Sequence, residues 1–76
     1  MKLILMGFDN TTETLSEDFD VTRIGLDAAV EILDIAIEEF VGDYELDAAQ
    51  LARISELTDL ILDPAVRDYF LGLRAD

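Results

Sequence analysis

The spacing of the apolar residues changes at Leu26, and this change constrains the fold more than any other feature of the sequence. From there onward they recur at intervals of three and four residues, which is the period of an amphipathic helix. The stripe consists of Leu26, Ala29, Val30, Leu33, Ile37, Phe40 and Val41. Gly42 follows as a terminator. We therefore predict a helix over residues 26–41.

Two further helices are predicted downstream. Asp47 and Gln50 form a capping box that opens a helix over 47–62. Its buried line is Leu51, Ile54, Leu57 and Ile61. Asp63 followed by Pro64 is typical of a helix start and predicts a third helix over 64–74. Its apolar positions are Val66, Tyr69, Phe70 and Leu73.

The N-terminal part of the chain has a different pattern. Residues Lys2 to Phe8 form a short apolar run that predicts a buried strand. Phe19 to Ile24 alternates enough to be a second strand in a hairpin, and Thr14 to Glu17 is either one helical turn or a loop. The predicted fold class is mainly α: a small three-helix domain preceded by a short N-terminal β-strand or hairpin.

The length of 76 residues predicts a single domain, 1–76, with a strand or loop segment at 1–25 and a helical segment at 26–76. Such a chain buries a small core, and without cysteine it has no disulfide to add stability. We therefore expect the chain to gain stability by self-association as a homodimer. Because no apolar run at the N-terminus is long enough for a signal peptide or a membrane span, we expect a cytoplasmic protein.

Composition excludes several functional classes. Histidine and cysteine are both absent, which removes proteases, thiol-redox enzymes and zinc fingers, so we expect no enzyme, no metal and no cofactor. Five Lys and Arg stand against 18 Asp and Glu, a formal charge of −13 at pH 7. Repulsion by phosphate groups therefore disfavours direct binding to nucleic acid or to anionic membranes.

A row of acidic residues follows the polar side of the predicted helix over 26–41. The row consists of Asp27, Glu31, Asp34, Glu38 and Glu39, with Asp43 and Glu45 extending it and Tyr44 as a possible interface anchor. On a helix these carboxylates would lie about 4 to 5 Å apart, close to the ~3.4 Å spacing of phosphates along one DNA strand. The row could therefore occupy a basic groove on a partner protein.

Other interpretations of the acidic residues and of Tyr44, without a binding function, remain open. The row could be a solvated face that keeps a small apolar protein in solution, the overall charge could reflect a high-salt habitat, and Tyr44 could pack on its own turn. Asp43, Glu45 and Asp47 alternate like a calcium loop, but Ala48 and Ile54 stand where an EF-hand needs glycine and glutamate. We therefore predict no calcium site.

From Ile24 to Ile61, the segments IGLDAAVEILDIAIEEF, YELD, ISEL and DLI resemble the middle and end of an acyl or peptidyl carrier protein. Carriers are acidic four-helix domains with a phosphopantetheine arm on the serine of a G-x-D-S-L motif. Gly25 and Asp27 match that motif, whereas Ala28 stands at the serine and Ala29 at the leucine. The resemblance therefore implies a carrier-like helical shape without the phosphopantetheine arm.

The leading functional hypothesis is a non-enzymatic acidic protein that blocks a basic, nucleic-acid-binding surface of a partner, as a nucleic-acid mimic or a small phage-type inhibitor does. Neutralising Asp34 and Glu38 together should then weaken binding and flatten its salt dependence. The alternatives are a helical adaptor or dimerisation module that uses apolar helix faces, and a degenerate carrier-like domain.

Overall fold

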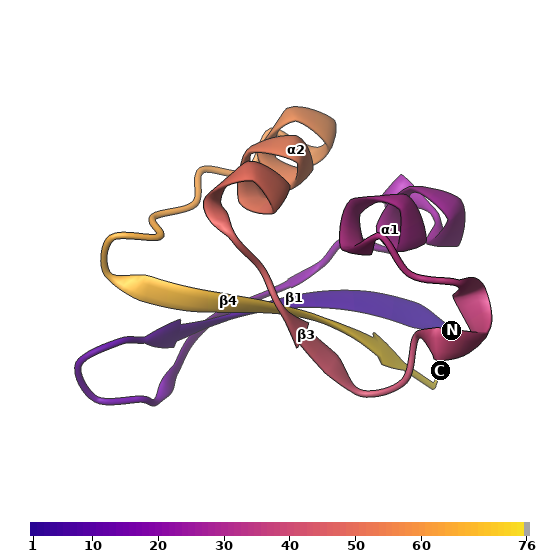
Figure 1. The fold of residues 1–76 in the computed structure, drawn as a ribbon. Helices are drawn as coiled ribbons and strands as arrows, with labels where there is room; N and C mark the ends of the chain where they lie inside the picture. Colours follow the sequence, from indigo (N-terminus) through magenta and orange to yellow (C-terminus); the bar gives the residue numbers. More distant parts are fainter. Residues whose placement is uncertain (76) are drawn as a thin grey trace.

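The computed structural model describes residues 1–75, which form a four-stranded sheet and several helices. The strands are β1 (Lys2–Asp9), β2 (Leu15–Asp20), β3 (Asp43–Glu45) and β4 (Arg67–Arg74). The α-helices are α1 (Leu26–Leu33) and α2 (Ala48–Thr58), and the short 3₁₀ helices are η1 (Thr22–Ile24) and η2 (Ile37–Glu39). All strand pairs are antiparallel, in the order β2-β1-β4-β3 (Figure 1).

The two longest strands, β1 and β4, lie at the centre of the sheet. Their register pairs Lys2 with Arg74, so the start of β1 and the end of β4 are neighbours (Figure 1). The turn from β1 to β2 is shaped by Asp9, whose carboxylate accepts hydrogen bonds from the N–H groups of Thr11 and Thr12 at 2.8 and 3.1 Å. These bonds lower the pKa of Asp9.

The helices begin and end at recognisable residues. α2 opens with the predicted capping box, because Asp47 accepts from the N–H of Gln50 while the Gln50 side chain accepts from the N–H of Asp47, both at 2.8 Å. Asp34 follows α1 and Asp59 follows α2, and both adopt the left-handed conformation, with φ of 56° and 61°. Aspartate tolerates this conformation better than most residues, so it can terminate a helix as glycine does.

Both α-helices lie on the same face of the sheet, and the core lies between the two layers (Figure 1). The core consists of Leu3, Leu5, Val21, Ala29, Leu33, Phe40, Leu46, Leu51, Ile54, Tyr69 and Leu71. The Tyr69 side chain is buried, and its hydroxyl donates to Glu17 at 2.7 Å and accepts from the N–H of Asp63 at 3.1 Å. The polar atom of this buried side chain is therefore fully paired.

The predicted mainly α, three-helix fold class is wrong, and the helices do not form a helical bundle. Residues 64–74 do not form a third helix, because Arg67–Arg74 pairs along its whole length with β1. Tyr69, Leu71 and Leu73 alternate toward the core, and this two-residue period competes with the helical spacing in the same segment. A four-stranded sheet is the result.

The other predicted elements are shorter or displaced. The helix predicted over 26–41 stops at Leu33, and Val41 is 73% exposed rather than buried. The helix predicted over 47–62 stops at Thr58, which leaves Ile61 93% exposed. The second strand spans Leu15–Asp20 instead of 19–24, so residues 15–17 enter a strand instead of a helical turn or a loop, while Thr14 precedes the strand.

The carrier-like helical shape implied by the resemblance is not found, since the sheet replaces the bundle. None of the helices within residues 1–75 is long and apolar enough to cross a bilayer.

Candidate functional site

The predicted acid row is not a continuous helix face, yet most of its members lie together. Four of its carboxylates surround a hollow of about 400 Å³ between α1 and η2, which we call the α1–η2 hollow. Its lining consists of Asp27, Val30, Glu31, Asp34, Ile35, Ala36 and Glu39. Glu38 lies on η2 and is exposed outside this lining. Glu39 is engaged within the chain, because its carboxylate accepts from the N–H of Ala36 at 2.8 Å.

The remaining predicted site residues lie on β3 and point to opposite sides of the sheet. Asp43 and Glu45 are exposed, whereas Tyr44 is partly buried and packs against the core. The Tyr44 ring makes an edge-to-face contact with Phe40 at 5.9 Å, and its hydroxyl donates to the carbonyl oxygen of Glu39. The sheet therefore separates the Tyr44 side chain from the two acids beside it.

A second surface, not anticipated from the sequence, lies on the side of the sheet opposite the helices, which we call the open face. Side chains of β1 and β4 that alternate with the core residues emerge there. Its apolar centre consists of Ile4, Met6, Phe8 and Phe70, each partly buried. Met6 and Phe70 are direct cross-strand partners, and the rings of Phe8 and Phe70 meet edge to face at 5.7 Å.

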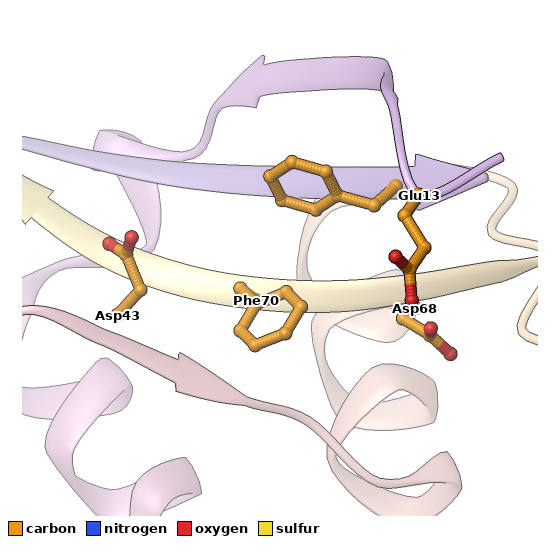
Figure 2. Close-up of a pocket in the computed structure, with 5 residues that line it drawn as sticks. Glu13, Asp43, Asp68 and Phe70 are labelled. Atoms are coloured by element: carbon orange, nitrogen blue, oxygen red, sulfur yellow. The ribbon is translucent and has the colours of Figure 1, made fainter. Parts of the chain in front are cut away.

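Carboxylates surround this apolar centre on both sides. Asp18 and Asp20 stand opposite Met6 and Ile4 in the β1–β2 register, and Glu45 stands opposite Phe70 in the β3–β4 register. The rim consists of Glu13, Asp18, Asp20, Asp43, Glu45 and Asp68, all exposed. Part of the apolar centre and part of the rim form a hollow of about 370 Å³. It is lined by Phe8, Glu13, Asp43, Asp68 and Phe70. In Figure 2, Phe70 lies between Asp43 on one side and Glu13 with Asp68 on the other.

Two cationic side chains, Lys2 and Arg74, stand at one end of the open face. Arg74 donates to Asp43 at 2.8 Å, and its other terminal nitrogen lies 3.5 Å from the sulfur of Met6. The bond to Asp43 raises the pKa of Arg74. Asp20 is held in the carboxylate form, since hydrogen bonds from the Thr22 side chain and N–H lower its pKa. Asp20 is therefore charged at neutral pH.

The other arginines are held by partners within the chain. Arg53 pairs with Glu56 at 2.8 Å. Arg67 contacts Glu17 at 3.5 Å, and Arg23 donates to the carbonyl oxygen of Thr58 at 2.7 Å. By contrast, no carboxylate of the α1–η2 hollow is in an ion pair within residues 1–75. The carboxylates of this hollow are therefore exposed without a neutralising cationic side chain from the described residues.

The residues of the open face give two partial signals in the sequence. Lys2 to Phe8 is apolar at nearly every position, which is expected when both faces of a strand contact apolar groups. Phe70 lies between Tyr69 and Leu71, so a strand there must direct it away from the core. Neither signal identifies the open face if residues 64–74 are predicted to be a helix.

The open face presents both charged and apolar side chains that can contact a ligand. Within residues 1–75, no group of three or more His, Cys, Asp or Glu side chains is arranged to hold a metal ion. Exposed carboxylates around an apolar floor can accept hydrogen bonds from ammonium or guanidinium groups while apolar side chains pack between them.

Comparison with known proteins gives a family and no function. Nothing among curated proteins or solved structures matches the chain. Residues 2–72 match a family described as a domain of unknown function, DUF7683. Since this match begins with β1, contains both α-helices and extends into β4, the chain belongs to the DUF7683 family.

Proposed function

We propose that this protein is a non-enzymatic binding protein that covers a basic surface of a partner protein, and that the covered surface is one that binds nucleic acid. The observation that carries the proposal is the distribution of charge. All four arginines have partners within the chain, whereas the carboxylates of the α1–η2 hollow and most of those on the open face have no ion-pair partner in residues 1–75.

Such a surface attracts a cationic partner over long range. With a formal charge of −13 the chain presents the same sign of charge as a nucleic acid, so it competes for the same groove and gains from release of the same counterions. The acid row contributes in this proposal through Asp27, Glu31, Asp34, Glu38 and Glu39, which stay exposed although the helix is interrupted.

The alternative of an adaptor that uses apolar helix faces has less support. The apolar residues of α1 that it would need include Ala29 and Leu33, and both are buried in the core. The third helix that it would also use is strand β4.

The test is capture of partners from a lysate of the source organism at about 50 mM and about 200 mM salt, with mass spectrometry of the retained proteins. A nucleic-acid-binding protein that is retained at low salt, released at high salt and displaced by added duplex DNA or RNA supports the proposal. Retention that is unaffected by salt and by nucleic acid contradicts it, because an apolar contact would behave in that way.

A further inference from the structure

The open face is an apolar surface that the fold leaves uncovered. Ile4, Met6, Phe8 and Phe70 are not among the side chains packed against the core, and both α-helices lie on the opposite side of the sheet (Figure 1). A small protein gains nothing for its own fold by leaving such a group at the surface, and contiguous apolar residues with a polar rim are typical of interaction sites.

The charge around the open face indicates which kind of partner can bind there. Six carboxylates and two cationic side chains surround the apolar centre, a formal surplus of four negative charges. A second copy of the chain docking face to face would bring two such surpluses together, and a nucleic acid or an anionic membrane would also be repelled. A cationic protein segment is attracted instead.

Arg74 shows how a guanidinium group fits here. At the end of the open face it donates to Asp43 at 2.8 Å while its second terminal nitrogen lies over Met6, 3.5 Å from the sulfur. One arginine therefore satisfies a rim carboxylate and covers part of the apolar floor at the same time. Glu13 and Asp68, on the far side of Phe70, have no ion-pair partner within residues 1–75 (Figure 2).

We infer that the open face is the docking surface for the partner, and that it binds a segment in which an aliphatic or aromatic side chain is flanked by arginines. The apolar side chain enters the hollow of about 370 Å³ over Phe8 and Phe70. The arginines donate to Glu13 and Asp68 and stack on the faces of the phenylalanine rings. This inference rests on the proposed function and adds to it the place of contact and the chemistry of the partner.

The experiment uses two synthetic peptides of equal charge, Arg-Arg-Leu-Arg-Arg-Leu-Arg and the same peptide with serine in place of both leucines. Binding to the full chain is measured by titration calorimetry at low salt. We expect the leucine peptide to bind about tenfold more tightly than the serine peptide, because one buried leucine is worth roughly that factor. Phe70→Ala should abolish this preference.

Two double variants with the same change in charge locate the contact. Glu13→Gln with Asp68→Asn neutralises the open face, and Asp34→Asn with Glu38→Gln neutralises the acid row. We expect the first double variant to bind the leucine peptide about tenfold more weakly and the second to lose less than about threefold, since the second changes only long-range attraction. Circular dichroism of each variant verifies that it is folded.

The outcomes separate the two proposals. If both double variants lose affinity equally and leucine gives no advantage, binding depends on overall charge, which overturns the open-face inference and leaves the proposed function standing. If neither peptide binds the wild-type chain, both are overturned. If Phe70→Ala fails to fold, the pair of double variants, which change only exposed side chains, still decides the question.

Discussion

The two faces of the sheet both have apolar centres, but only one of them is covered. Leu3, Leu5, Tyr69 and Leu71 are buried beneath the helices, whereas Ile4, Met6 and Phe70 alternate with them and remain partly exposed on the other side. The same two strands therefore supply a core and a surface. The covered face therefore determines stability, and under the proposed function the apolar groups of the open face contact a partner.

The largest difference between the faces should appear on truncation of neighbouring residues of β1. Leu5→Ala leaves a cavity in the core and should lower the free energy of unfolding by about 3 to 4 kcal/mol, whereas Ile4→Ala, on the open face, should cost about 1 kcal/mol. Urea denaturation of both variants measures this. An Ile4→Ala variant that is as unstable as Leu5→Ala would mean that something covers the open face in solution.

The two glycines of the central strands sharpen the comparison. A methyl group at Gly7 would lie 2.7 Å from the ring of Tyr69, which is buried and cannot move aside, so Gly7→Ala should cost about 2 kcal/mol. At Gly72 a methyl group would clash with the carboxylate of Asp43 and with Arg74. Both of these side chains are exposed and can rotate away, so Gly72→Ala should cost less than about 1 kcal/mol.

The melting temperatures of the two glycine variants test this order. Gly72→Ala should also break the ion pair between Asp43 and Arg74, which a change in the Arg74 side-chain NMR signals would reveal. Equal destabilisation by the two substitutions would contradict this account, in which the buried side chain near Gly7 cannot move aside and the exposed side chains near Gly72 can.

Alkaline pH should act on the covered face through Tyr69. Burial raises the pKa of its hydroxyl above 10.0, so the unfolded chain loses this proton first, and stability should fall as the pH rises above 10. Tyr69→Phe should cost about 1 kcal/mol at neutral pH by removing the hydrogen bonds of the hydroxyl. It should also flatten the alkaline dependence, which denaturation at several pH values measures. An unchanged alkaline slope in Tyr69→Phe would exclude this residue as the cause.

Acid pH should act on the open face through Asp20, with the smallest effect. The hydrogen bonds from Thr22 lower the pKa of Asp20 below 3.8, so its contribution to stability is present above that value and is lost as the pH falls through the lowered pKa. An NMR titration of the Asp20 carboxyl carbon measures the pKa directly. In Thr22→Ala the pKa should rise, and an unchanged value would show that Thr22 is not the cause.

Local signals in the sequence predicted part of the fold correctly. The run at Lys2 to Phe8 lies within β1, and Asp47 with Gln50 caps α2 as their spacing indicates. The third helix failed because Arg67–Arg74 contains both a helical and a two-residue period, and the choice is made by pairing with β1 at the other end of the chain. Such a tertiary contact is not visible in local spacing.

Local spacing also predicted part of the candidate site. The spacing of Asp27, Glu31 and Asp34 brought acids together even though α1 ends early, because one helical turn is enough to align neighbours three and four residues apart. The open face could not be predicted, since it depends on which side of the sheet the helices cover. The helical spacing therefore predicts Phe70 on the apolar side of a helix, whereas it lies partly buried on the open face.

The most direct test of the open face as the contact surface is an NMR titration of the ¹⁵N-labelled protein with the leucine–arginine peptide. We predict that the amide signals of Phe8, Glu13, Asp68 and Phe70 shift, while those of Glu31, Asp34 and Ala36 stay in place. Shifts confined to α1 and η2 would contradict the account and assign the contact to the acid row instead.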